Sequence, residues 1–338
     1  MAELSDRTAR MADFLAATPW AASNRTLVAG DASNRRYDRL TRPDGSTAIL
    51  MDAPPEKGED VRPFIRIANY LVASGLSAPK LLEADEAQGF LIIEDLGDDL
   101  YASLMALDAS LEQPLYAAAI DVLVHLHRAD PLDLPPCDPV WMAGMNRLIF
   151  DWYAQDTPTG ARAAFDDAFR PLAQSLEETP KVVILRDYHA QNLLWLPDRQ
   201  GVARVGQLDF QDALLGHPAY DVVSILQDAR RDVSPLMETQ MIDRYLAATG
   251  MDQSAFERAY AILGAQRNLC ILGIFARLCQ RDGKAHYVDL IPRVWNYVLR
   301  DLAHPDLARI AQVLGPILPE PTPDFLNRLK SRCATSPS

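Results

Sequence analysis

The sequence has little positive charge and no apolar leader. Its 338 residues include 33 lysines and arginines against 46 aspartates and glutamates, a formal net charge of -13. Proteins that bind nucleic acid concentrate basic residues against the phosphates, so this balance argues against a nucleic-acid partner. The first 15 residues mix charges and lack the apolar core of a signal peptide. We see no apolar stretch as long as a membrane span and therefore predict a soluble, cytoplasmic protein with no membrane partner.

Cysteines are also few, and their spacing indicates no site. The four are Cys137, Cys270, Cys279 and Cys333. None stands in a CxxC pair or at a zinc-ligand distance from a histidine. We therefore expect unpaired thiols in a reducing compartment. A chain of this length can bury a large core without covalent links.

The first third of the chain predicts a small β-rich lobe. Short apolar runs separated by turn residues are typical of antiparallel strands. We expect strands at 26–29, 37–40, 47–51, 81–84 and 90–94, with one helix at 61–74 between the third and the fourth. Gly75 stands where a left-handed helix cap belongs. Residues 1–96 are thus predicted to form a small N-terminal lobe that ends in a hinge at 93–96.

The remainder, residues 97–338, is predicted to form a large, mainly helical lobe. Helical patterns cover 110–129, 141–155, 160–177, 219–230, 235–248, 254–281, 285–301 and 304–313. A strand pair at 182–185 and 193–196, interpreted as a hairpin, and a strand at 202–208 interrupt them. The whole is an α+β, two-lobed fold, a plan in which ligands bind in the cleft between lobes.

The candidate chemistry lies around that predicted hairpin. Asp187 and Asn192 stand five residues apart between two apolar runs, and Asp209 follows seventeen residues after Asn192. Phosphoryl transfer needs a carboxylate that takes the proton of the acceptor hydroxyl and hard oxygen ligands that hold Mg²⁺ on the phosphates. The hairpin would bring these three side chains to one end of neighbouring strands. The alternative for Asp187 and Asn192 is a simple turn with Asx hydrogen bonds.

These residues resemble a known superfamily. Asp187-x₄-Asn192, followed by Leu208-Asp209-Phe210, is similar to the catalytic loop and metal-binding motif of aminoglycoside phosphotransferases and choline kinases, which share the protein-kinase fold. The resemblance implies that Asp187 is the catalytic base, that Asn192 and Asp209 bind Mg²⁺, and that ATP is the donor. It also implies that residues 1–96 are the nucleotide-binding lobe and residues 97–338 the catalytic and substrate lobe. Asp221, in a matching Gly-x-Pro-x-x-Asp segment, would brace the loop or serve only as a carboxylate at a helix start.

The nucleotide site departs from the protein-kinase pattern. The phosphate loop, residues 30–37, has a single glycine, so backbone N–H groups and the side chains of Ser33 and Asn34 would cradle phosphate, unless the segment is an ordinary hairpin turn. The strand at 47–51 has no lysine, and the helix at 61–74 has no glutamate to pair with one.

Other residues must then supply the nucleotide contacts. Arg35, Arg36 and Lys57 are the candidates for the missing positive charge, with no ground in the sequence to choose among them. Glu94 and Leu96, in the predicted hinge, would contact adenine through their backbones.

Three segments, 30–37, 50–56 and 266–278, look like those of the anomeric kinases for N-acetylmuramate and N-acetylglucosamine, which also lack the lysine. This resemblance implies an ATP-dependent kinase that phosphorylates an amino sugar at its anomeric hydroxyl in cell-wall recycling. Arg267 and Arg277 would then meet a lactyl carboxylate, unless both form salt bridges on the helix surface. Asp212 is either a further carboxylate at the site or a solvated one.

Two other functions remain open. One is an aminoglycoside-type antibiotic kinase, which a concentrated acidic rim on the substrate side would favour. The other is a nucleotide-binding module without turnover, which the missing lysine suggests and the set of Asp187, Asn192 and Asp209 argues against.

Overall fold

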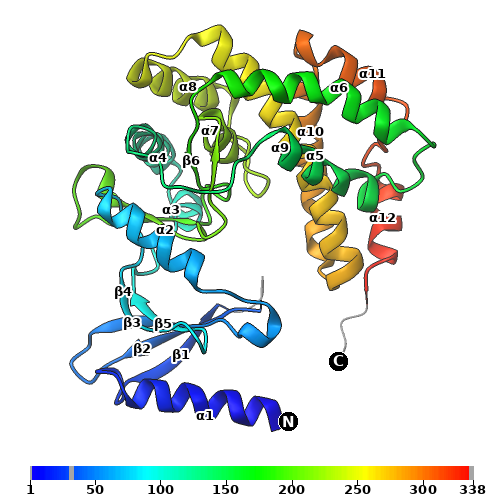
Figure 1. Ribbon diagram of the computed structural model, residues 1–338. Coiled ribbons are helices and arrows are strands. Elements are labelled where there is room, and N and C mark those ends of the chain that lie inside the picture. Colours follow the sequence, from blue (N-terminus) through cyan, green and yellow to red (C-terminus); the bar gives the residue numbers. More distant parts are fainter. Residues whose placement is uncertain (1, 30–33, 335–338) are drawn as a thin grey trace. The chain divides into compact units, whose positions relative to one another are not determined.

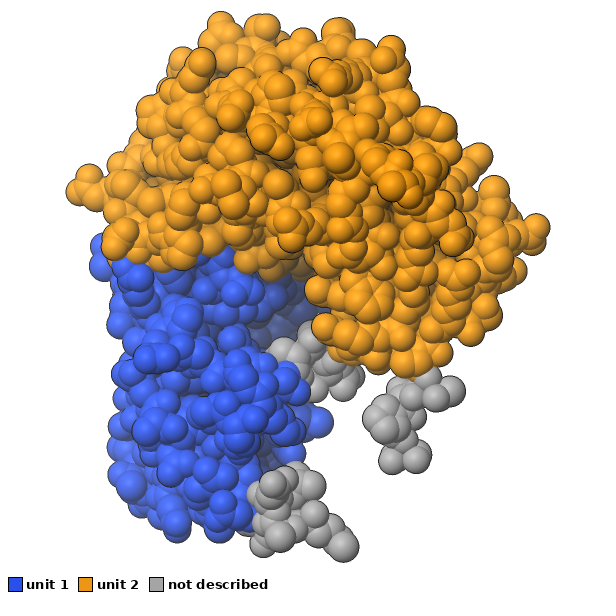
Figure 2. Space-filling model, turned by 45° about the vertical axis from the view of Figure 1, so that its right-hand side comes forward, with its two compact units in different colours: residues 1–122, 191–213 blue, residues 123–190, 214–338 orange. Residues whose placement is uncertain are grey.

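A computed structural model describes residues 2–29 and 34–334, and the chain forms two compact units. Unit 1 contains residues 1–122 and 191–213, and unit 2 contains residues 123–190 and 214–338; Figure 2 shows them in blue and orange. Residues 191–213 thus pack with the N-terminal strands, although their sequence follows the first helices of unit 2. The functional boundary between residues 96 and 97 stays a prediction.

Unit 1 is built on a five-stranded antiparallel sheet with the order β1-β2-β3-β5-β4 (Figure 1). The strands are β1 (Asn24–Ala29), β2 (Arg36–Thr41), β3 (Thr47–Asp52), β4 (Leu81–Asp85) and β5 (Phe90–Glu94). All five predicted strands are confirmed to within a few residues. The unit's helices are α1 (Ala2–Ala16), α2 (Arg62–Ala73), α3 (Tyr101–Leu107) and the first part of α4 (Glu112–Leu126). Gly75 follows α2 with a φ of 78°, the predicted left-handed cap.

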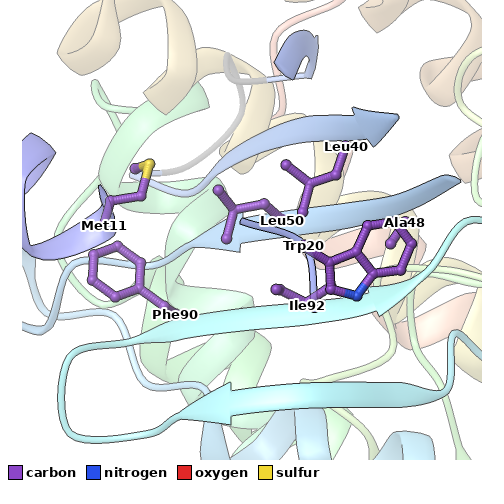
Figure 3. Close-up of a cluster of buried hydrophobic side chains, with 7 residues drawn as sticks. All are labelled: Met11, Trp20, Leu40, Ala48, Leu50, Phe90 and Ile92. Atoms are coloured by element: carbon purple, nitrogen blue, oxygen red, sulfur yellow. The ribbon is translucent and has the colours of Figure 1, made fainter. Parts of the chain in front are cut away.

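Helix α1 covers one face of this sheet. Alternate residues of the strands, including Leu40, Leu50 and Phe90, are buried against Met11 and Trp20 of the N-terminal segment (Figure 3). Arg7 of α1 is held at the end of β3, since it donates to the Asp52 carboxylate at 2.5 Å. The Arg7 guanidinium also lies 3.9 Å from the centre of the Phe90 ring. Burial of this apolar face stabilises the sheet and leaves its opposite face toward α2.

Unit 2 is mainly helical. Its helices are α5 (Pro139–Leu148), α6 (Ala161–Ser175), α7 (Ala219–Leu226), α8 (Pro235–Thr249), α9 (Gln253–Asp282), α10 (Ile291–Leu302), α11 (Ala308–Leu314) and α12 (Pro323–Ser331). Most of the predicted helices are confirmed, with α10 starting later than expected because residues 285–290 form a 3₁₀ helix. Helices α3 and α12 were not predicted.

Helix α9 is the centre of unit 2. It spans 30 residues and is long and apolar enough to cross a membrane, contrary to our reading of the sequence. However, 89% of its most apolar window is buried inside the protein, which is the position of a core helix. α9 packs against α5, α7 and α10, and its Gly273 lets the backbone of α5 approach closely.

The predicted hairpin of residues 182–185 and 193–196 is wrong. In unit 2, β6 (Val182–Ile184) pairs with β9 (Leu214–Gly216). In unit 1, β7 (Leu193–Trp195) pairs with β8 (Val205–Gln207). The physical reason lies in the connecting loop, because the N–H groups that follow β6 bond a side chain of α7 and do not continue a ladder toward residue 193.

The expectation of four unpaired cysteines is also wrong. Cys137 and Cys270 are free and buried, but Cys279, near the end of α9, forms a disulfide with Cys333, which follows α12. The two are 54 residues apart in the sequence, so no local spacing motif indicates the pairing.

The close approach at Gly273 yields a prediction of stability. A Cβ atom there would lie 2.4 Å from the carbonyl carbon and oxygen of Leu148, and backbone atoms cannot move aside cheaply. We expect Gly273→Ala to lower the free energy of unfolding by about 2 kcal/mol or more. Gly144, on the exposed side of α5, has no atom within 4 Å of such a Cβ. The control Gly144→Ala should raise stability by about 0.5–1 kcal/mol, because alanine favours the helix. Denaturant unfolding of both variants checks this, and equal stabilities would contradict it.

Candidate active site

The predicted metal ligands come together at the end of the β7–β8 ladder, within unit 1. Leu193 pairs with Gln207, and the Leu208 N–H donates to the Asn192 carbonyl at 2.9 Å, which extends the ladder to the two predicted ligands. The Asn192 Nδ2 atom lies 3.5 Å from Asp209 Oδ2, at the outer limit of a hydrogen bond. The sequence therefore placed Asn192 beside Asp209 correctly, although through a different strand pair.

The local backbone exposes the Asp209 carboxylate while burying its neighbour. Asp209 has a φ of 56°, a left-handed conformation that is uncommon for any residue other than glycine. Phe210 is fully buried, and its ring stacks on Phe64 of α2 at 5.0 Å between centres. Gln211 donates to Asp209 Oδ1 at 2.8 Å. The strained residue is thus held by the burial of Phe210, and its carboxylate stays on the surface.

This donor set fits Mg²⁺. An exposed carboxylate and a side-chain amide oxygen are hard ligands, and Mg²⁺ usually takes one or two protein carboxylates and fills its shell with phosphates and water. Among the described residues no group of three or more histidine, cysteine or acidic side chains is arranged as a complete metal site. The pair is therefore suited to a metal that arrives with a phosphate ligand. Asp212, the further candidate, is also exposed.

Asp187 stands in unit 2, directly after a tight turn. Its N–H donates to the Leu185 carbonyl at 2.8 Å, and the residue between them, Arg186, has a φ of 69°. A three-residue turn with a positive central φ is rare and strained. Because non-glycine residues adopt this conformation only when their surroundings impose it, the contacts around Arg186 decide where Asp187 points.

Asp221, at the start of α7, holds the turn by its N–H groups. Its carboxylate accepts from the Leu185 N–H at 2.6 Å and from the Arg186 N–H at 2.9 Å. Asp221 is 0% exposed, and burial raises its pKa to about 7, although the two N–H donors and the Arg267 charge lower it. Asp221 therefore does more than place a carboxylate at the start of a helix. It fixes the backbone N–H groups of two residues that lie 36 and 35 positions earlier in the sequence.

Sequence reasoning missed Ser224. Its hydroxyl donates to the Arg186 carbonyl at 2.9 Å and accepts from Arg267 Nη2 at 2.8 Å. A signal was present in the sequence, because Ser224 is the one hydroxyl residue among Val222, Val223, Ile225 and Leu226, three positions after Asp221. Arg267 itself is buried, at 7% exposure, and its Nη1 atom has no partner among the described residues. It is therefore not the exposed helix arginine that our alternative reading assumed.

The predicted phosphate loop lies partly outside the described residues, and Ser33 is among those that are not described. Asn34 donates from Nδ2 to the Lys57 carbonyl at 3.2 Å, and its N–H bonds Glu59 at the same distance. Arg35 forms an ion pair with Glu59 at 2.7 Å. Lys57 and Glu59, which follow β3, thus bind the end of the predicted phosphate loop. An ordinary hairpin turn would not need these contacts from another segment.

The predicted hinge residues are engaged inside unit 1. Glu94 forms an ion pair with Arg199 at 2.7 Å, and its N–H donates to the Lys80 carbonyl at 2.8 Å. Leu96 is buried in an apolar cluster with Leu194 and Leu196. Beside it lies a pocket of about 270 Å³, lined by residues 95–99 and 195–199. Any nucleotide contact at these positions falls on the backbone or on the Leu96 side chain.

Solved structures with the same architecture place the fold among small-molecule kinases. A choline/ethanolamine kinase family protein from Mesorhizobium loti superposes with a TM-score of 0.64 at 13% identity, covering 96% of this chain and 99% of that one. An aminoglycoside phosphotransferase from Streptomyces rimosus, in complex with ADP and streptomycin, gives a TM-score of 0.52 at 16% identity, covering 78% and 98%. Both likenesses confirm the predicted α+β, protein-kinase-like fold.

Sequence comparison then identifies the family. The profile of the phosphotransferase enzyme family matches residues 24–259, and the chain belongs to this family. A protein of Caulobacter vibrioides named N-acetylmuramate/N-acetylglucosamine kinase is 41% identical over 347 aligned residues, which cover 90% of this chain and 95% of that protein. The predicted resemblance to phosphotransferases and to amino-sugar kinases is thereby confirmed.

Proposed function

We propose that this protein transfers the γ-phosphoryl group of ATP to the anomeric hydroxyl of N-acetylmuramate and N-acetylglucosamine. The observation that carries this proposal is the 41% identity to the Caulobacter vibrioides kinase over almost the whole chain, which includes the segment from Asp187 to Asp221. The product would be a sugar 1-phosphate for cell-wall recycling, and the cytoplasm, which contains ATP, would be the compartment.

Asp187 is the general base. It takes the proton of the acceptor hydroxyl as that oxygen attacks the γ-phosphorus, while the bond to the bridging oxygen of ADP breaks. An anomeric hydroxyl is more acidic than an ordinary alcohol, so an aspartate suffices for this proton transfer. The strained turn at Arg186 serves to point the Asp187 carboxylate, because general base catalysis requires hydrogen-bond reach to the proton.

Asn192 and Asp209 would hold the metal of the nucleotide. Mg²⁺, when bound, neutralises charge on the transferring phosphates. The chain supplies the two oxygen ligands and orients them: the Leu208 N–H fixes the backbone of Asn192, and Gln211 binds one oxygen of Asp209. The other Asp209 oxygen then remains toward Asn192.

Among the three candidate cations, Lys57 is the best placed for a phosphate. Arg35 is neutralised by Glu59, and Arg36 bonds Asp38 at 3.1 Å. The Lys57 side chain is exposed and pairs with no acidic residue in the part of the chain that the structure describes, while its carbonyl binds Asn34 of the predicted phosphate loop. An unpaired ammonium beside that loop is the available charge for the nucleotide.

Arg277 is the better placed of the two predicted carboxylate-binding arginines, since Arg267 already serves Ser224. Arg277 stands seven residues, or about two turns, after the buried Cys270 on α9, so the two residues share one face of the helix. The Arg277 Nε atom is buried and has no hydrogen-bond partner among the residues that the structure describes. The acidic residue that it influences, Asp282, is hydrogen-bonded to Arg281 instead. Arg277 is therefore open to the lactyl carboxylate of N-acetylmuramate.

The central test is phosphorylation of N-acetylglucosamine, N-acetylmuramate and kanamycin with ATP and Mg²⁺, read by product mass and by the acid lability of the phosphate. We expect an acid-labile sugar phosphate from both sugars. The product should disappear with EDTA or with Asp187→Asn, which removes the base but preserves its shape. Phosphorylated kanamycin alone would assign the protein to the antibiotic kinases. Nucleotide binding without any product would leave a module that does not turn over.

Substitution of the three cations tests the nucleotide contact. We expect Lys57→Ala to raise the apparent KM for ATP by roughly 10- to 100-fold, the loss of a charged hydrogen bond. Arg35→Ala and Arg36→Ala serve as matched controls and should raise it much less, because their charges are already paired. Three equal effects, measured at saturating sugar, would refute the assignment.

Acceptor discrimination tests Arg277. We expect Arg277→Met to lower kcat/KM for N-acetylmuramate by roughly 10- to 100-fold while N-acetylglucosamine, which has no carboxylate, is nearly unaffected. Arg281→Met is the control, since this exposed arginine is one turn further along α9 and bonds Asp282 at 2.7 Å. An unchanged ratio of the two sugars in Arg277→Met would remove the arginine from recognition.

A further inference from the structure

The strained turn before Asp187 has all its backbone groups accounted for. The N–H groups of Leu185 and Arg186 both bond Asp221, and the Leu185 carbonyl accepts from the Asp187 N–H. Only the Arg186 carbonyl remains, and it accepts from the Ser224 hydroxyl at 2.9 Å. Buried backbone groups need such partners, so each of these bonds contributes to a conformation that the sequence alone would not adopt.

The Ser224 hydroxyl is in turn oriented from α9. Arg267 Nη2 donates to Ser224 Oγ at 2.8 Å, so the hydroxyl proton is directed to the Arg186 carbonyl, the other side of the oxygen being occupied. Ser224 is 0% exposed and Arg267 is 7% exposed. A buried arginine on a core helix is costly unless it has a specific partner, and a serine inside an all-buried helix adds nothing to packing that alanine would not.

Asp221 and Ser224, both on α7, hold different sides of the turn at Arg186. Asp221 and Ser224 are three residues apart on α7, so they lie on one face, toward the turn. Asp221 holds the N–H side of Arg186 and Ser224 holds its carbonyl side. Rotation of the peptide between Arg186 and Asp187 would break the Ser224 bond and the Asp187 N–H bond to the Leu185 carbonyl, without breaking either Asp221 bond. Ser224 is therefore the side chain that holds this peptide plane from outside the turn.

We propose that Ser224 and Arg267 are positioning residues for phosphoryl transfer: through the Arg186 carbonyl they fix the peptide plane that aims the Asp187 carboxylate at the acceptor hydroxyl. The proposal rests on the proposed function for its kinetic consequence, but its structural content is independent of the acceptor. It differs from the expectation that Arg267 binds substrate, because neither residue has to touch a ligand.

The test compares Ser224→Ala, Arg267→Met and Arg267→Lys. Ser224→Ala should lower kcat by about tenfold or more, with KM for ATP and sugar within about twofold, because the base is misdirected while the binding groups remain. Arg267→Met should act in the same direction more weakly, and Arg267→Lys, which can still donate to Ser224, should restore most of the rate. The double variant Ser224→Ala/Arg267→Met should match Ser224→Ala alone, since the arginine acts through the serine.

Arg300→Met serves as the control for general destabilisation. Arg300 is a partly exposed arginine of unit 2 that bonds Glu238 at 2.6 Å, so its loss should lower stability without lowering kcat. A raised KM for the sugar with unchanged kcat in Arg267→Met, not reversed by lysine, would overturn the proposal in favour of substrate binding. An unchanged kcat in Ser224→Ala would overturn it as well.

Hydrogen exchange of the peptide that covers residues 183–188 gives a readout without catalysis. We expect faster exchange there in Ser224→Ala and Arg267→Met than in wild type and Arg300→Met, with α5 unchanged in all. If wild type phosphorylates none of the acceptors, the proposed function fails while this measurement still decides the positioning role. If wild type is active and exchange at 183–188 stays unaltered in Ser224→Ala, the positioning role fails alone.

Discussion

The buried carboxylate of Asp221 is the interaction on which the loop before Asp187 depends. An ionised carboxylate without water is costly, and burial is the largest cause of the rise in the pKa of Asp221 to about 7. Two backbone N–H donors and the Arg267 charge oppose that rise, and they do so only while Arg186 keeps its strained conformation. The ionisation of Asp221 and the shape of the turn therefore stabilise each other. A neutral apolar residue would be easier to bury, but it would leave both N–H groups unpaired.

A second constraint, the apolar packing of β3 and α2 in unit 1, bears on the absent lysine. Met51, near the end of β3, is fully buried, and α2 presents Phe64, Ile67, Ala68 and Leu71 to the interior. An ammonium placed among these side chains would lie unpaired in an apolar region and lose its hydration. The same apolar helix has another use, since Phe64 stacks on Phe210 and thereby holds the backbone beside Asp209. The lysine and the glutamate that would pair with it are thus absent together, and buried apolar side chains line both elements.

Local patterns explain which parts of the fold could be predicted. The strands between residues 24 and 94 are short apolar runs separated by turn residues, so their existence was predicted from short windows of sequence. The pairing of β6 was not, because its partner β9 has three residues, Leu214–Gly216, and shows no alternation that distinguishes it from a loop. The Cys279–Cys333 disulfide likewise joins a buried position to a half-buried one, and no spacing motif connects them.

The candidate site divides along the same line. Asp187, Asn192 and Asp209 could be proposed from residue type and spacing, because phosphoryl transfer with Mg²⁺ needs a carboxylate base and oxygen ligands. Ser224 was not, since its importance lies in a neighbour 38 residues away and not in its own chemistry. The residues around Ser224 nevertheless indicate that it makes a contact. Every residue of α7 is buried, and a buried hydroxyl needs a hydrogen-bond partner inside the protein. A polar residue in an apolar helix, at the same face as a buried aspartate, therefore marks a contact to look for, even before the partner is known.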